Sequence, residues 1–95
     1  MFLVLAHYSI ATGNHAAVLD LVTELAQATR LEEGCLGFDS YVNTDDDSEL
    51  ILVERYESAD DFAAHRESET YQELVLEQIV PLLSDRSVES FTVPD

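Results

Sequence analysis

The apolar and polar positions of this chain follow two periods, which predict its secondary structure. The opening run MFLVLAHYSI is apolar and rich in β-favouring residues, so it predicts a strand. From His15 to about Leu31 the apolar residues recur at helical spacing, and Asn14 precedes them as a candidate N-cap. The predicted helical stripe consists of Val18, Leu21, Val22, Leu25 and Ala28 or Thr29. Gly34 follows the helix, as expected for a residue that tolerates positive φ.

Two strands joined by a polar hairpin are predicted next. CLGFDSYV (35–42) and LILVERY (50–56) are both rich in β-branched, aromatic and other apolar residues. The segment between them, NTDDDSE (43–49), is polar throughout. Such clusters of Asn, Asp and Ser are typical of turns. We therefore expect an antiparallel pair of strands here.

The pattern of the last part of the chain predicts a helical region followed by a strand. Ser58, with Asp61 three residues later, forms a capping-box pattern that predicts a helix start. A second helical segment is expected from Ser68 to Pro81. Its stripe consists of Tyr71, Leu74, Val75, Gln78 and Ile79. The sequence SDRS predicts a turn, and VESFTV (88–93) predicts the final strand.

The element order β-α-β-β-α-β predicts one ferredoxin-like α+β domain over residues 1–95. Its four-stranded antiparallel sheet would carry helices on one face only. By alternation we assign to the other face Phe2, Val4, Ala6, Tyr8, Ile51 and Val53. An apolar face of this size should be covered, so we predict a homodimer in which two sheets pack together.

Several titratable side chains are directed into the layer between sheet and helices. The predicted helix-facing side of strand 50–56 carries Leu52, Glu54 and Tyr56. On the following helix, Phe62 and His65 lie three residues apart and share a face. The same reasoning places His7 of the first strand on the helix-facing side. A carboxylate, a phenol and two imidazoles would then converge in one apolar layer, which is the candidate site.

Each of these residues also has a structural interpretation. A histidine on an amphipathic helix is more often a satisfied structural residue than a catalyst. Glu54 could pair with Arg55, Arg30 or a backbone amide, and without a partner its pKa would rise. The residues alone leave both interpretations open.

The net charge argues against two classes of partner. Twenty acidic residues and four arginines give a formal net charge of −16, which disfavours nucleic acid and anionic membrane surfaces. The acids indicate either a well-solvated surface or adaptation to salt. The first apolar run lacks a basic region and is too short for a signal peptide or a membrane span. The cytoplasm is therefore the expected compartment.

Two other kinds of chemistry are disfavoured by local sequence. Cys35 is the single cysteine, and the neighbouring Glu32 and Glu33 would oppose formation of a thiolate. A small buried residue is the expected role for Cys35. The acidic loop 43–49 lacks the glycine-centred spacing of a calcium loop, so no metal site is expected there.

The segments EEGCLGFDSY and ELILVERYESADDFAAHRESETY resemble the antibiotic biosynthesis monooxygenase family. The resemblance rests on the combination of an acid, a Gly-Cys-Leu strand, a strand with Glu-x-aromatic, and a helix with His. It covers nearly the whole chain and implies a dimeric α+β barrel. Some members of this family oxidise quinols or anthrones with O₂ without a cofactor. Others degrade haem or isomerise a phosphorylated signal metabolite.

Matching positions narrow these activities. Haem-degrading members carry their proximal histidine where this chain has Val75, a residue that cannot bind iron. They also have tryptophan at the position of His65 and asparagine near that of His7. Anthrone-oxidising members use asparagine, tryptophan and tyrosine at positions matching Leu52, Tyr56 and Phe62, of which only the aromatic character of Tyr56 is kept. The resemblance therefore favours the quinol-oxidising branch, with the isomerase branch second.

The resulting hypothesis is a cofactor-independent monooxygenase acting on a small aromatic or quinol-type substrate. His65 or His7 would accept a proton, because an imidazole titrates near neutral pH. Tyr56 would orient the substrate oxygen and Glu54 would hold an imidazole. The expected pocket residues are Tyr56, Glu54, Phe62, Phe38, Leu52 and Tyr71. The alternatives are an isomerase whose phosphate anchor is Arg30 or Arg66, and a binding module of the same fold without turnover.

Overall fold

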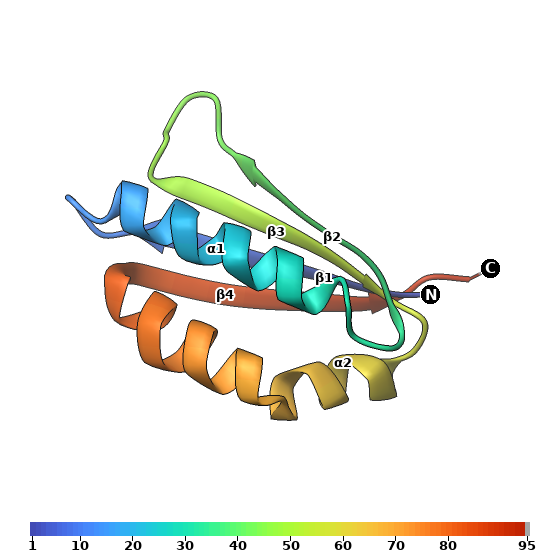
Figure 1. The fold of residues 1–95 in the computed structure, drawn as a ribbon. Coiled ribbons are helices and arrows are strands. Elements are labelled where there is room, and N and C mark those ends of the chain that lie inside the picture. The colour runs from blue at the N-terminus through green and yellow to red at the C-terminus, as the bar shows by residue number, and fades with distance from the viewer. Residues whose placement is uncertain (95) are drawn as a thin grey trace.

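The computed structural model describes residues 1–94 and shows a four-stranded antiparallel sheet with its helices on one face (Figure 1). The strands are β1 (Phe2–Ile10), β2 (Cys35–Val42), β3 (Glu49–Tyr56) and β4 (Leu83–Thr92). Their order in the sheet is β2-β3-β1-β4. This arrangement confirms the predicted ferredoxin-like α+β fold.

The helical elements are α1 (His15–Thr29), α2 (Ala59–Glu67), the π-type helix η1 (Tyr71–Ile79) and the short 3₁₀ turn η2 (Val80–Leu82). Serine hydroxyls cap the N-terminal ends of two of these helical segments. Ser58 Oγ accepts a hydrogen bond from the Asp61 amide at 3.3 Å, which confirms the predicted cap of α2. Ser68 Oγ accepts one from the Tyr71 amide at 3.1 Å. These caps fix where α2 and η1 begin, and so where their inward-facing side chains lie.

The turn between α1 and β2 depends on Gly34. Helix α1 ends at Thr29, two residues earlier than predicted, and Gly34 has a φ of 87°. A Cβ at this position would collide with the Asp61 side chain at the start of α2. The Gly34 carbonyl accepts a hydrogen bond from the Glu57 amide at 2.8 Å. The turn is therefore packed directly against the beginning of α2.

The last strand begins earlier than its sequence predicts. Residues 84–87, predicted as a turn, belong to β4, which pairs with β1 from Leu83 onward. In this pairing Arg86 lies opposite Tyr8. The prediction was wrong because the segment's polarity was read as a turn signal. An edge strand tolerates such polarity, since much of it stays in contact with water.

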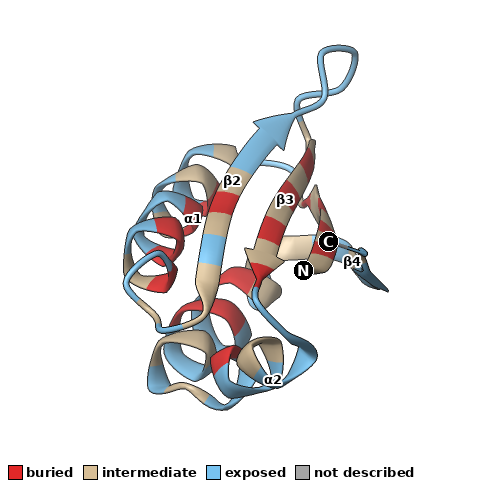
Figure 2. Cartoon of the chain, turned by 90° about the vertical axis from the view of Figure 1, so that its right-hand side faces the viewer, coloured by how far each residue is buried: buried red, intermediate tan, exposed pale blue. Residues whose placement is uncertain are grey.

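The two faces of β1 were also assigned the wrong way round. Val4, Ala6 and Tyr8 are buried beneath the helices, whereas Leu3, Leu5 and His7 lie on the open face. The antiparallel register decides this, because Val4 pairs with Glu54 and Ala6 pairs with Leu52. Directly paired residues share a face of the sheet. Alternation on β3 was assigned correctly, and Figure 2 shows buried residues alternating along this strand.

The open face of the sheet is apolar in its centre and polar near its edges. It carries the partly exposed residues Leu3, Leu5, Ile51 and Val53, and the more exposed Tyr41 and Phe91. Polar neighbours on this face include the ion pair of His7 with Glu89. The predicted apolar face thus exists, but β1 contributes a different set of residues to it.

Candidate functional site

His65 lies in the layer between sheet and helices, as predicted. The residue is only 3% exposed, and four aromatic rings surround its imidazole. Their centroids lie at 5.3 Å for Tyr71, 5.7 Å for Tyr56, 6.3 Å for Phe62 and 6.4 Å for Phe38. The structure therefore brings together the predicted imidazole and four of the predicted pocket residues.

A line of polar contacts crosses this aromatic layer. The Tyr56 hydroxyl donates to Glu54 Oε1 at 2.6 Å, and Glu54 Oε1 lies 3.9 Å from His65 Nε2. On the other side of the imidazole, His65 Nδ1 lies 2.9 Å from Glu32 Oε1. We call Glu32, His65, Glu54 and Tyr56 the His65 network. It begins at the partly exposed Glu32 and ends at the buried Tyr56.

Glu32 is the member of this network that sequence reasoning did not identify. It lies 33 residues before His65 in the turn that Gly34 packs against α2. Local patterns do not report contacts at such a separation. The glycine after the two acids was the one available signal, because it predicted a sharp turn at this point. The alternative ion pairs considered for Glu54 do not form, since its carboxylate accepts from Tyr56 instead.

Burial gives Glu54 unusual acid–base properties. The buried environment raises its pKa from 4.5 to about 7, the hydrogen bond from Tyr56 opposes this shift, and the charge of Glu32 adds to it. The carboxyl group therefore changes protonation near neutral pH. Burial also raises the pKa of Tyr56, and the adjacent Glu54 raises it further, so Tyr56 stays a neutral donor.

His65 is held as a neutral imidazole. Burial lowers its pKa, while the charge and the hydrogen bond of Glu32 act in the opposite direction. Because the Glu32 carboxylate can only accept, the hydrogen of the neutral ring belongs on Nδ1. The lone pair of Nε2 is then free on the side of Glu54. This arrangement suits a group that accepts a proton inside an apolar site.

Comparison with known proteins agrees with this fold. The sequence profile described as "Antibiotic biosynthesis monooxygenase" matches residues 1–75. The chain belongs to the antibiotic biosynthesis monooxygenase family. No protein with curated function matches it significantly.

Several solved structures superpose closely on the chain. Rv0793 from Mycobacterium tuberculosis is 28% identical with a TM-score of 0.90, and the match covers 99% of this chain and 95% of that one. A crystal structure described as an antibiotic biosynthesis monooxygenase is 26% identical with a TM-score of 0.92, and both chains are covered completely at 100%. A Nitrosomonas europaea protein assigned provisionally to the same family is 21% identical, with 98% of each chain covered and a TM-score of 0.92. This last likeness supports the fold alone.

His7 lies apart from the His65 network in this family member. It projects from the open face of the sheet, where its Nε2 lies 3.1 Å from Glu89 Oε1. Its side chain is 44% exposed. The predicted convergence of two imidazoles is therefore wrong, because β1 presents His7 on the face away from α2. Leu52, in contrast, is 1% exposed beneath the helices as predicted.

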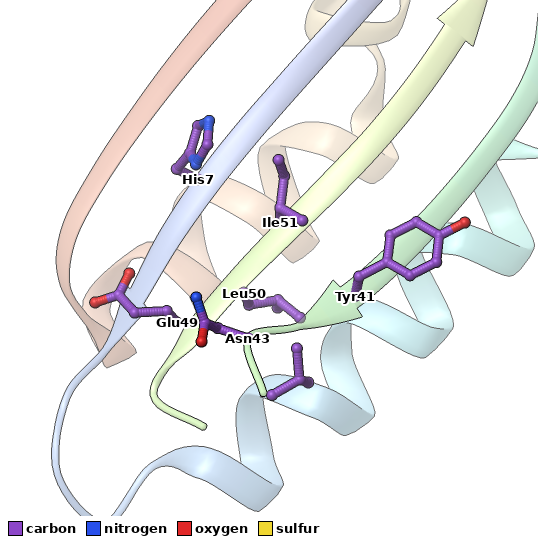
Figure 3. Close-up of a pocket in the computed structure, with 7 residues that line it drawn as sticks. His7, Tyr41, Asn43, Glu49, Leu50 and Ile51 are labelled. Atoms are coloured by element: carbon purple, nitrogen blue, oxygen red, sulfur yellow. The ribbon is translucent and has the colours of Figure 1, made fainter. Parts of the chain in front are cut away.

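A hollow of about 290 Å³ lies on the open face near the 43–48 loop. Figure 3 shows His7, Ile51 and Tyr41 projecting beside it from β1, β3 and β2. Two further hollows, of about 250 and 300 Å³, lie beside Cys35 and beside Gly13. None of these three hollows is lined by His65. His65, which is 3% exposed, is closed off from all three hollows.

Cys35 and the acidic loop have structural partners in this domain. Burial raises the pKa of Cys35, with Glu32 and Glu54 adding to the shift, and its Sγ lies 3.6 Å from the Gly37 carbonyl. In the loop, Asn43 Oδ1 accepts from the amides of Asp45 and Asp46. Within residues 1–94, no three His, Cys, Asp or Glu side chains are grouped as a metal site would need. No helix in this range is long and apolar enough to cross a membrane.

Proposed function

We propose that this protein is a cofactor-independent monooxygenase that oxidises a small quinol-type aromatic substrate with O₂. The observation that carries the proposal is the His65 network. It combines a neutral imidazole oriented by Glu32 with a carboxyl group of pKa about 7, inside an aromatic shell. Membership of the family supports this class of reaction.

The proposed chemistry begins with removal of a proton. His65 Nε2 accepts the proton of a substrate hydroxyl. The Tyr56 hydroxyl, whose single hydrogen is donated to Glu54, stabilises the developing anion by turning this hydrogen from Glu54 to the substrate oxygen. The electron-rich anion then transfers an electron to O₂, and recombination forms a carbon–oxygen bond. Overall, one quinol and one O₂ give one hydroxyquinone and one water. All the electrons needed come from the substrate, so no reductant is required.

Access to His65 depends on the side chains that cover it. Phe62 and Tyr71 contact the imidazole ring, and both are only partly buried. They belong to α2 and η1, which are joined by the short segment around Ser68. We therefore expect these two aromatic side chains to move apart when the substrate enters.

The decisive test is quinol-dependent O₂ uptake by His65→Gln and by the matched variant His7→Gln. We expect His65→Gln to lower kcat/KM by about 100-fold or more, the usual contribution of a general base. His7→Gln should stay within about twofold of the wild type, because His7 lies on the other face of the sheet. Undiminished uptake by a folded His65→Gln variant would refute the proposal.

A binding module without turnover is the second candidate. The aromatic shell around His65 supports it, because these rings would contact a bound aromatic ligand whether or not the ligand is oxidised. Ligand-dependent thermal stabilisation with no O₂ consumption would support this function. The isomerase alternative has less support, because Arg30 donates to the Phe38 carbonyl and Arg66 lies over the Phe62 ring.

We also propose that two copies associate through the open sheet face. This face carries contiguous apolar side chains from β1 and β3, which a stable protein usually covers. The family fold is also commonly dimeric. The cytoplasmic location expected from the sequence stays a prediction that cell fractionation can test.

A further inference from the structure

Two arginines in residues 1–94, Arg66 and Arg86, have no carboxylate within ion-pair distance, and of these two Arg86 is the more buried. Arg30 and Arg55 both lie near Asp39, at 3.8 and 3.7 Å between charged atoms. Arg86 is half-buried on β4, and across residues 1–94 no carboxylate oxygen lies within ion-pair distance of it. With twenty acids available in the chain, the lack of an acidic partner at this arginine calls for an explanation.

The neighbours of Arg86 are neutral phenols. Its Nη2 donates to the Tyr71 hydroxyl at 3.3 Å, and this is its one side-chain hydrogen bond within the described part of the chain. A guanidinium has five N–H donors, so most of its binding capacity is unused. Tyr8 lies directly opposite Arg86 in the β1–β4 pair and therefore on the same, helix-facing side of the sheet.

Tyr8 contributes a second group that can bind an oxygen atom. The residue is 3% exposed, and its hydroxyl makes no hydrogen bond to another group of residues 1–94. The fully buried unpartnered side-chain atoms in this range are His15 Nε2 and Thr29 Oγ1, so the Tyr8 oxygen keeps some access to solvent. Burial raises the pKa of Tyr8, Glu54 adds to this shift and Arg86 opposes it. Tyr8 is thus a neutral donor, and the charges of Glu54 and Arg86 shift its pKa in opposite directions.

Tyr71 connects Arg86 to the His65 network. The Tyr71 ring meets the His65 imidazole edge-on, with the two centroids 5.3 Å apart. Tyr71 and Arg86 are both partly exposed, whereas His65 is closed off from solvent. A substrate entering beside Tyr71 would therefore have one end at the imidazole and the other near the guanidinium.

We propose that Arg86, Tyr71 and Tyr8 form an anchoring subsite for a carboxylate on the substrate, whose aromatic ring lies against His65. A guanidinium binds a carboxylate through two parallel hydrogen bonds, and the phenols supply further donors. The inference rests on the proposed function and narrows its substrate class to carboxylated phenols or quinols. The substrate carboxylate would also be the negatively charged partner of Arg86, which no acidic side chain of residues 1–94 provides.

The test measures binding in the absence of O₂, by calorimetry, with two probes. Gentisate is a quinol with a carboxylate, and hydroquinone is the same ring without it. We expect the wild type to bind gentisate at least about tenfold more tightly than hydroquinone, as charge-assisted hydrogen bonds would give. Arg86→Gln should remove this preference, Arg86→Lys should keep part of it, and Tyr8→Phe should weaken gentisate binding.

The control is Arg55→Gln, which removes the same charge from the open face of the sheet and should retain the preference. Thermal unfolding of each variant shows whether it is folded. Equal affinity for the two probes, no detectable gentisate binding, or the same loss in Arg55→Gln would overturn the inference. Displacement of gentisate by inorganic phosphate at lower concentration would also overturn it, because the anchor would then select phosphate.

Binding and turnover are scored separately. If gentisate binds through Arg86 but no O₂ is consumed, the anchoring subsite stands and the monooxygenase proposal fails. If hydroquinone is oxidised as efficiently as gentisate, the monooxygenase proposal stands and the anchoring subsite fails.

Discussion

At the scale of single residues, Glu54 shows how position changes chemistry. On a surface its carboxyl group would ionise near its ordinary pKa of 4.5, but beneath the helices its pKa is about 7. Between these two pH values the unfolded chain releases a proton that the folded chain retains. The contribution of Glu54 to the free energy of unfolding therefore falls as pH rises through this window. For a shift of this size the change is at most roughly 3 kcal/mol.

The substitution Glu54→Gln tests this effect. Because the amide cannot ionise and its oxygen still accepts from Tyr56, we expect the variant to gain stability relative to the wild type as pH rises from about 5 to 8. Thermal unfolding followed by circular dichroism at a series of pH values measures the difference. The exposed Glu77→Gln removes the same charge and should show little of this trend. An identical trend in both variants would assign the effect to net charge instead.

At the scale of secondary-structure elements, the turn before β2 and the start of α2 act as one unit. Gly34 packs against Asp61, and Asp61 is in turn hydrogen-bonded to the Ser58 cap. The same turn carries Glu32, which meets His65 on α2. Any change that separates the turn from the helix therefore acts on both the stability and the His65 network.

Comparison of Gly34→Ala with Gly13→Ala tests the contact between Gly34 and Asp61. Both glycines have a φ of 87°, but a Cβ at Gly13 meets no atom within 4 Å. We expect Gly13→Ala to cost about 1–2 kcal/mol, the penalty for a left-handed conformation. Gly34→Ala should cost more, because α2 must also shift away from the turn. Urea unfolding measures both changes, and equal costs would contradict the packing role of Gly34.

At the scale of the whole molecule, the net charge of −16 and the open sheet face have opposite effects on the association of two copies. The apolar centre of the face favours association of two copies. Their combined negative charge opposes it, by repulsion that salt screens. The association proposed above should therefore strengthen as ionic strength rises.

Sedimentation velocity at low and high NaCl tests this expectation with two charge variants. Leu5→Glu places an acid on the open face and should shift the protein to monomers, because burying an unpaired charge is unfavourable. Leu31→Glu adds the same charge at a loop residue that is 88% exposed and should leave the dimer in place. A wild type that sediments as a monomer at high salt would rule out the dimer.

The sequence by itself determined the order of elements, the inward side of β3 and the cap of α2. These features depend on local periodicity and on neighbours a few residues apart. Tertiary structure decided the face of β1, because a strand that is apolar on both sides has no pattern to distinguish them. Pairing with β3 buried Tyr8 and exposed His7 on the open face. Tertiary packing likewise joined Glu32 to His65, and pairing of β4 with β1 placed Arg86 opposite Tyr8. Contacts between residues this far apart depend on how elements pack, which no local pattern records.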